Sequence, residues 1–335
     1  MAGKQKVAVY WLGACGGCDE TIVDLNEVIL DVVSAVDIVL WPVAMDFKYS
    51  SIKAMKKGEI ALSVIHGAVR NSDHEEMASL LREKSRLVLA FGSCACFGGT
   101  PGLANFRSKE DIFNWVYRDA PTVVNPKKHI PLPVSTDNGN QLTLPEFFDR
   151  VYTLDDTIDV DYYLPGCPPP PDLVGKAIFA VVEGKLPPKG ATLAPHKALC
   201  DSCPRNRTKP LKMEISGFRS PIEVEADPDT CFLSQGIICL GPAIRAGCGE
   251  TCIRVNTPCR GCFGPVEGVD DAGGSFISSL ASLISAENEG EAAALIDGIK
   301  DLSGYCYRFS APAATLRRPA GKKAGGAAHV AKDHH

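Results

Sequence analysis

The stretch KVAVYWLGACGGC, residues 6–18, decides the fold of the N-terminal half of this chain. Its first seven residues form an apolar run that is typical of a buried strand, and the glycines that follow predict a tight loop. Two cysteines, Cys15 and Cys18, lie in that loop. Because ligands bind beyond the carboxyl ends of parallel strands, the stretch predicts a first strand that brings a pair of thiols to one edge of a sheet.

Residues 1–185 continue this opening as an alternation of strand and helix patterns. Short apolar runs are followed repeatedly by amphipathic helical periodicity, which predicts an α/β fold with a doubly wound parallel sheet. We expect strands at 6–12, 37–43, 59–66, 86–92 and 159–164, and helices at 19–34, 71–84, 108–119 and 171–183.

Composition and charge narrow the possible functions. The chain has 335 residues, which is comfortable for two domains. Its formal net charge is -5, so the chain has no excess of basic residues and we expect no nucleic-acid partner. The most apolar stretch, residues 21–43, is interrupted by acidic side chains, and residues 1–11 lack the pattern of a signal peptide. We therefore expect no membrane span and a cytoplasmic location.

The alternation of strands and helices ends at Pro187. From there to Arg260 the chain is rich in Pro, Gly and Cys and has few apolar runs. Such a segment buries too little hydrocarbon to fold alone, so we expect bound metal to order it. Two helices with apolar core faces are expected after it, at 274–285 and 291–302. The predicted units are an α/β domain at 1–185, a mostly irregular and helical metal-binding domain at 186–310 and a disordered tail at 311–335.

Twelve of the fourteen cysteines form three groups of four. Four thiolates are the ligand count of a cubane 4Fe–4S cluster or of tetrahedral zinc. A reducing cytosol disfavours the alternative of a disulfide framework. The first group comes from the ends of the first, fourth and fifth strands, whereas the others are local in sequence. The first group is Cys15, Cys18, Cys94 and Cys167; the second is Cys200, Cys203, Cys231 and Cys239; the third is Cys248, Cys252, Cys259 and Cys262.

Several residues near these groups leave alternatives open. Cys96 and Cys306 are interpreted as buried small hydrophobes rather than ligands. His196 competes with Cys200 for a place in the second group. Five arginines would lower the free-energy cost of burying anionic clusters and raise the cluster potentials. Arginines scattered over the solvent-exposed surface, with no role at the clusters, are an almost equally good interpretation. The five are Arg205, Arg207, Arg245, Arg254 and Arg260.

An ordered set of motifs points to a known family. Along residues 15–265 the chain reads CGGC, GSCACFGG, PGCPPPP, CDSCPR, CFLSQGIICLGP and NTPCRGCFGP. This set resembles the small, iron–sulfur (gamma-type) subunit of cytosolic nickel–iron hydrogenases, and most closely that of the methyl-viologen-reducing hydrogenase of methanogens. The resemblance implies a flavodoxin-like N-terminal domain whose first group binds the cluster proximal to the nickel–iron centre of a large subunit. It also implies a distal cluster at the second group and a medial cluster at the third.

Three departures from the family pattern concern individual residues. Many relatives have histidine where Cys200 stands. The medial cluster often lacks a fourth cysteine, which Cys252 supplies here. Where the family commonly has Glu-Gly, this chain has His66–Gly67.

The implied function is a non-catalytic relay with three 4Fe–4S clusters. Electrons from H2 oxidation in the large subunit would pass to an acceptor iron–sulfur or flavin subunit linked to heterodisulfide reductase. No residue of this chain is expected to act as acid, base or nucleophile. One alternative is the cluster-bearing subunit of a quinone or ferredoxin oxidoreductase, which typically keeps only the first group. Another is a zinc-stapled interaction module.

Overall fold

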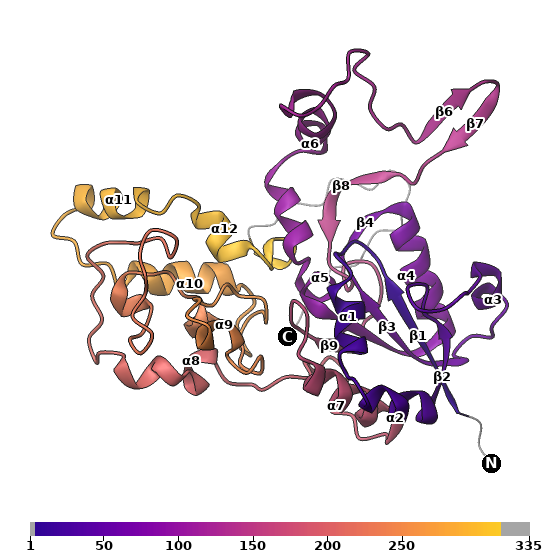
Figure 1. Ribbon diagram of the computed structural model, residues 1–335, viewed down its shortest axis with the longest axis horizontal. Coiled ribbons are helices and arrows are strands. Elements are labelled where there is room, and N and C mark those ends of the chain that lie inside the picture. Colours follow the sequence, from indigo (N-terminus) through magenta and orange to yellow (C-terminus); the bar gives the residue numbers. More distant parts are fainter. Residues whose placement is uncertain (1–3, 316–335) are drawn as a thin grey trace.

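The computed structural model describes residues 4–315, and a five-stranded parallel sheet organises its N-terminal half (Figure 1). The strand order is β2-β1-β3-β5-β9, which is the flavodoxin-like order 2-1-3-4-5 when only these strands are counted. The α/β class and the doubly wound sheet are therefore confirmed. The strands are β1 (Gln5–Trp11), β2 (Val36–Leu40), β3 (Ile60–His66), β5 (Ser85–Phe91) and β9 (Tyr162–Leu164).

Both faces of this sheet are buried, because successive side chains of a strand point to opposite sides. Val7 and Val9 of β1 join an apolar cluster with α1, α2 and α7, whereas Ala8 joins a second cluster with α4 and α5 on the other face. The continuous apolar runs seen in the sequence reflect this two-sided burial. The helices of this half are α1 (Gly17–Val23), α2 (Val28–Ala35), α3 (Tyr49–Lys53), α4 (Ser72–Lys84), α5 (Gly92–Phe97), α6 (Lys109–Asn114) and α7 (Pro171–Val182).

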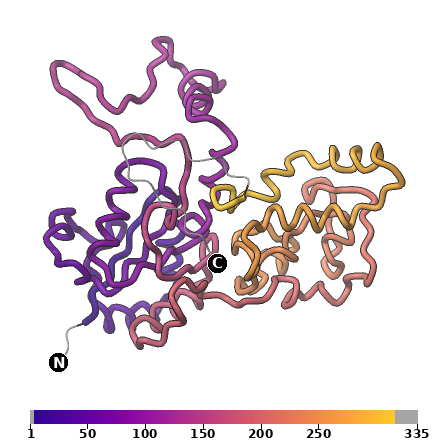
Figure 2. Tube along the Cα trace, turned by 180° about the vertical axis from the view of Figure 1, so that it is seen from behind, coloured from indigo at the N-terminus to yellow at the C-terminus, as the bar shows by residue number. Residues whose placement is uncertain are grey.

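An arm between α5 and β9 projects away from the sheet (Figures 1 and 2). Its tip is a two-stranded hairpin, β6 (Val134–Asp137) with β7 (Asn140–Thr143), in which all eight residues are exposed. Its base is pinned by β8 (Phe147–Tyr152), which pairs antiparallel with β4 (Val69–Asn71). None of these four strands was predicted from the sequence, since their apolar patterns are short and weak.

The C-terminal half has its own apolar cluster, formed by buried residues between Leu199 and Ala314. It contains short helices joined by irregular chain, as the composition of this segment predicts. No helix within residues 4–315 is both long and apolar enough to cross a membrane. The helices are α8 (Leu199–Ser202), α9 (Thr251–Arg254), α10 (Ala272–Ala281), α11 (Glu289–Asp297) and α12 (Leu302–Tyr307).

Two of the expected helices differ in the structure. The helix expected at 19–34 is divided into α1 and α2 by a turn in which Asn26 has a positive φ of 53°, a conformation that no helix interior tolerates. The apolar face expected to be core at 291–302 is only partly so: Ile299 and Leu302 pack against the C-terminal cluster, but the part in α11 does not. Helix α11 buries none of its residues, and Ile296 is 43% exposed. The tail predicted to be disordered from residue 311 does not begin there, because Ala311 and Ala314 are buried in the C-terminal cluster. Its remainder, residues 316–335, lies outside the described residues.

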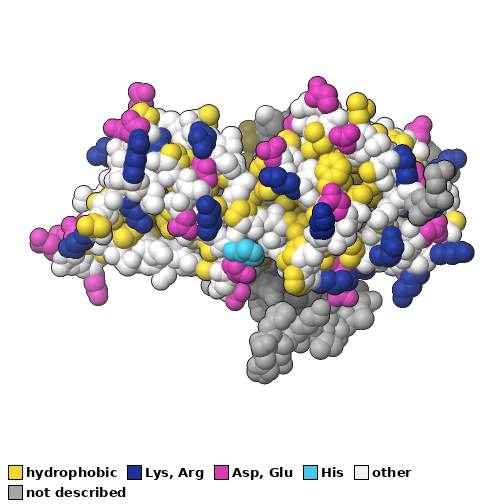
Figure 3. All heavy atoms as spheres, turned by 90° about the horizontal axis from the view of Figure 1, so that it is seen from below, with side chains coloured by type: hydrophobic (Ala, Val, Ile, Leu, Met, Phe, Trp, Pro, Cys, Tyr) yellow, Lys and Arg dark blue, Asp and Glu magenta, His cyan; other side chains and the backbone are white. Residues whose placement is uncertain are grey.

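Charged side chains of both signs are dispersed over one face of the molecule. On the face shown in Figure 3, Lys and Arg side chains alternate with Asp and Glu side chains across both halves of the described chain. That face carries no continuous basic area of the kind that binds nucleic acid.

Candidate metal centres

The first group of cysteines gathers at the carboxyl edge of the parallel sheet. Cys15 and Cys18 follow β1, Cys94 lies in α5 directly after β5, and Cys167 follows β9. Burial raises the pKa of the Cys18 thiol, and negative charge on Cys94, Cys167 and Cys15 adds to this effect, so the four side chains lie close together. Burial, followed by charge on Cys167 and Cys15, likewise raises the pKa of Cys94 to about 12.

Two glycines leave space around the sulfur atoms of this first group. Gly92 has a φ of 81°, and a Cβ atom added there would collide with Cys18 Sγ. Gly99 has a φ of 56°, and a Cβ atom added there would collide with Cys94 Sγ. Both positions require glycine for conformation and for space.

Cys96 does not belong to this first group. It lies with Cys94 on helix α5 rather than on extended chain, and two residues along a helix point to roughly opposite sides. Its buried Sγ donates to the carbonyl oxygen of Ala90 at 3.3 Å. This is the structural position that the sequence predicted, reached by helical rather than extended geometry.

The second group surrounds a small pocket that all four of its cysteines line. Burial, followed by charge on Cys239, raises the pKa of Cys200 to about 12. His196 is not among the residues that line this pocket. Its Nδ1 atom lies 2.6 Å from Glu267 Oε2, and its side chain is 67% exposed. The structure therefore brings Cys200, rather than His196, to the second group.

The third group is assembled from α9, which contains Cys252, and from the loops on both sides of it, which supply Cys248, Cys259 and Cys262. Charge on Cys248, Cys167 and Cys252, together with the larger effect of burial, raises the pKa of Cys262 to about 12. Burial also raises the pKa of Cys259, and charge on Cys239 is its second cause. Cys252 is exposed yet close enough to Cys248 and Cys262 to affect both thiols.

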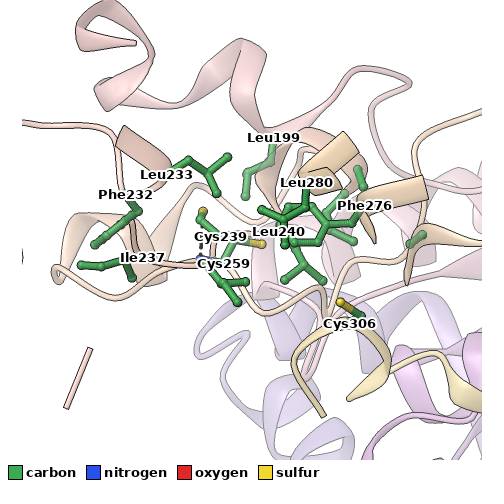
Figure 4. Packing of buried hydrophobic residues seen from close by; sticks show 14 of the residues in the cluster. Leu199, Phe232, Leu233, Ile237, Cys239, Leu240, Cys259, Phe276, Leu280 and Cys306 are labelled. Carbon is green, nitrogen blue, oxygen red and sulfur yellow. Dashed lines mark hydrogen bonds between the residues drawn. The ribbon is translucent and has the colours of Figure 1, made fainter. Parts of the chain in front are cut away.

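The three groups lie in the order first, third, second. The backbone N–H of Cys167 donates to Cys262 Sγ, and Ser93 Oγ donates to the carbonyl oxygen of Cys262, so the first and third groups touch. The backbone N–H of Cys259 donates to Cys239 Sγ at 3.4 Å, so the third and second groups touch (Figure 4). Along the chain the second group comes before the third, so the sequence does not reveal that the third group lies between the other two in space.

The donor set suits iron–sulfur clusters. All fourteen cysteines are free thiols in the structure, so no disulfide competes for them. Within residues 4–315, no three His, Cys, Asp or Glu side chains converge closely enough to hold a single metal ion. Four thiols around a pocket, as in the second group, fit the four-cysteine ligand set of a 4Fe–4S cube.

A buried polar cluster next to the first group was not predicted. His66 is completely buried at the end of β3, and its Nε2 atom lies 3.0 Å from Asp19 Oδ2. The other carboxylate oxygen of Asp19 accepts from Trp41 Nε1 at 2.8 Å. The available sequence signal was Asp19, directly after Cys18, but an acidic residue is also common in the first turn of an ordinary helix.

Comparison with known proteins agrees with this architecture. A family model described as NADH ubiquinone oxidoreductase, 20 Kd subunit, matches residues 15–181. The NiFeSe hydrogenase of Desulfovibrio vulgaris Hildenborough shares the fold, with a TM-score of 0.52 and 18% identity over 80% of this chain and 95% of that one.

Two relatives match at higher identity over nearly the whole chain. The iron-sulfur subunit of the F420-non-reducing hydrogenase of Archaeoglobus profundus is 40% identical over 319 residues, which cover 93% of this chain and 98% of the relative. The corresponding subunit of the F420-non-reducing hydrogenase of Methanothermobacter thermautotrophicus is 35% identical over 94% of this chain and 97% of its own length. This chain therefore belongs to the family of the iron–sulfur subunits of F420-non-reducing hydrogenases, and it is a hydrogenase small subunit.

Proposed function

We propose that this chain carries electrons through three 4Fe–4S clusters, away from H2 oxidation in a nickel–iron large subunit. The first group would hold the proximal cluster, the third group the medial cluster and the second group the distal cluster. The chain would supply no acid, base or nucleophile to the reaction. The twelve proposed ligands are Cys15, Cys18, Cys94, Cys167, Cys200, Cys203, Cys231, Cys239, Cys248, Cys252, Cys259 and Cys262.

The observation that carries this proposal is the contact between successive groups of cysteines. Cys167 of the first group touches Cys262 of the third, and Cys259 of the third touches Cys239 of the second. Ligands of neighbouring clusters would thus be hydrogen-bonded to one another, which provides short paths for electron transfer. A set of zinc staples has no need of such a continuous row.

The direction of flow and the acceptor are further parts of the proposal. Because the first group lies at one end of the row, electrons would enter there and leave from the second group. The acceptor would be an iron–sulfur or flavin subunit linked to heterodisulfide reductase, with ferredoxin reduced by flavin-based bifurcation, in the cytoplasm. We assign the proximal cluster to a domain of residues 1–185 and the other two clusters to residues 186–310.

A second candidate is the cluster-bearing subunit of a quinone oxidoreductase. The description of the matching family model favours it. That match ends at residue 181, before the eight cysteines of the second and third groups begin. A function that needs only the first group leaves these eight thiols unexplained.

Metal analysis of protein purified under anaerobic conditions tests the proposal. We expect about twelve irons and about twelve sulfides per chain, broad visible absorption, and bleaching when H2 is added to the complex with the large subunit. About three zinc ions without sulfide would eliminate the relay. About four irons per chain, all at the first group, would favour the quinone oxidoreductase reading.

A further inference from the structure

Of the five arginines interspersed with the C-terminal cysteines, Arg260 has the least compensated guanidinium. Arg205 donates to the carbonyl oxygens of Asp227 and Thr230 and to Asn256, and Arg245 donates to the carbonyl oxygen of Pro195. The exposed side chains of Arg207 and Arg254 lie 3.8 Å and 3.5 Å from carboxylates. In contrast, the buried Nη1 atom of Arg260 has no hydrogen-bond partner among the described residues.

Arg260 stands where the second and third groups meet. It directly follows Cys259, whose backbone N–H donates to Cys239 Sγ at 3.4 Å. The Arg260 guanidinium carbon lies 4.0 Å from the centroid of the Tyr305 ring, so a cation–π contact holds the side chain in place. This contact leaves Nη1 without an acceptor among the described residues.

The electrostatic surroundings of Arg260 are unbalanced in the absence of clusters. Burial lowers the pKa of the guanidinium, and charge on Tyr305 opposes this effect. The positive charge of Arg308 lowers the pKa further, while charge on Cys239 and Cys259 raises it. Taking a cation out of water without a partner is costly, and a nearby anion offsets the cost. Four thiolates around a 4Fe–4S cube make an anionic centre, and Cys239 and Cys259 are proposed ligands of two such centres.

We propose that Arg260 sets the redox potentials of the medial and distal clusters. This inference rests on the proposed function. Each cluster gains one negative charge when it accepts one electron, and a fixed positive charge nearby stabilises the reduced form. The guanidinium keeps its proton throughout, so no proton accompanies the electron. Arg260 would thus favour electron transfer from the proximal cluster onto the next two.

The test compares Arg260→Gln with Arg260→Lys in the complex with the large subunit. Cluster potentials are measured by redox titration followed by paramagnetic resonance. We expect the glutamine variant to reduce the equilibrium constant for reduction of the medial and distal clusters at least tenfold. This corresponds to a fall of about 59 mV in each potential for one electron. The proximal potential should not change, and the lysine variant should keep most of the wild-type values. Arg219→Gln removes an exposed charge from the same segment and should leave all potentials unchanged.

The possible results separate this inference from the function on which it rests. Wild-type protein without clusters would refute the proposed function. Wild-type and glutamine proteins with equal iron and equal potentials would refute the role of Arg260 alone. Arg260→Met, which refills the space over Tyr305 without a charge, covers the case in which the glutamine variant loses iron. Loss of iron in both neutral variants but not in the lysine variant supports the inference, whereas equal loss in all three overturns it.

Discussion

A thiol that packs in the core differs from a ligand thiol in what surrounds it. Cys306 is 3% exposed within the C-terminal apolar cluster, and burial together with Asp271 raises its pKa to about 12. Cys252 is exposed, yet it lies near two other thiols, Cys248 and Cys262. If burial were the criterion for a ligand, the buried Cys306 would be chosen and the exposed Cys252 rejected. The neighbouring sulfur atoms distinguish them.

Replacing Cys252 by alanine should convert the medial cluster to a three-iron form. The exposed thiol is the fourth member of the third group, so its loss should release about one iron and leave the other three ligands in place. Paramagnetic resonance of the oxidised protein should then show a new three-iron signal. A spectrum identical to that of the wild type would mean that Cys252 binds no iron.

Replacing Cys306 by alanine should leave the iron content unchanged. The substitution removes one buried sulfur from an apolar cluster, so the free energy of unfolding should fall by about 1 kcal/mol. Iron analysis and urea denaturation measure the two effects separately. Loss of about four irons would show that the division of the cysteines into groups is incorrect.

At the scale of elements, the turns that follow the parallel strands bring the cysteines of the first group together. The turn from β5 into α5 brings Gly92 against Cys18, which lies in a different helix, α1. Strand β9, which leads to Cys167, is held by Asp161, whose carboxylate receives hydrogen bonds from Arg82 at 2.6 Å, from the backbone N–H of Val88 at 2.8 Å and from Lys189. The ligands thus depend on contacts between elements.

Replacing Gly92 by alanine should empty the first site. The new methyl group would occupy the position of Cys18 Sγ, so about four irons should be lost. Gly139→Ala is the matched control, because Gly139 has a similar φ of 83° but no atom within 4 Å of an added Cβ. Both variants should lose about 1 kcal/mol of stability from the strained backbone. Full iron content in the Gly92 variant would contradict the assigned geometry.

Replacing Asp161 by asparagine should weaken the edge of the sheet. Burial raises the pKa of Asp161, but hydrogen bonds from Lys189, Arg82 and Val88 outweigh it and lower the pKa below its usual value. A lowered pKa stabilises the fold above the unfolded value of about 3.9 and loses this effect as the pH falls below it.

Urea denaturation should therefore show a loss of about 2 kcal/mol for Asp161→Asn at pH 7, and the difference from wild type should shrink below about pH 4. Asp46→Asn, a change at an exposed aspartate, should have no comparable effect. A difference that stays constant down to pH 3 would exclude the charged carboxylate as the cause.

At the scale of the whole molecule, the two halves are stabilised in different ways. The N-terminal half has apolar clusters on both faces of a five-stranded sheet. The C-terminal cluster instead includes Cys239 and Cys259 among its buried members, with Cys203, Cys231, Cys248 and Cys262 packed against it. The proposed cluster ligands are thus part of this hydrophobic core, so metal binding and folding should be coupled there.

Removal of iron by a chelator should unfold the C-terminal half before the N-terminal half. Thiols that lose their clusters would repel one another when ionised and leave unfilled space in the core, as at the pocket that the second group lines. Limited proteolysis with mass spectrometry should then show early cleavage within 187–262 and late cleavage within residues 4–185. Equal protection of both halves in the iron-free protein would contradict this coupling.

The sequence by itself determined the local features of this protein. Apolar runs and helical periodicity predicted the parallel strands and α4, whose cap Asn71 accepts from His74 N at 2.9 Å. Cysteine spacing assigned the three groups, because ligand loops are short and their chemistry is explicit. The family followed from the order of the motifs. These features depend on neighbours along the chain, and a pattern of residues records them.

Only the tertiary structure decided how the groups are ordered and what surrounds them. The contacts of Cys167 with Cys262 and of Cys259 with Cys239 join loops that are distant in sequence. The burial of His66 beside Asp19, the projecting β6–β7 arm and the exposed face of α11 likewise depend on how elements pack. Periodicity reports which residues could face a core, but packing between distant segments decides which of them do, because burial is a property of the whole fold.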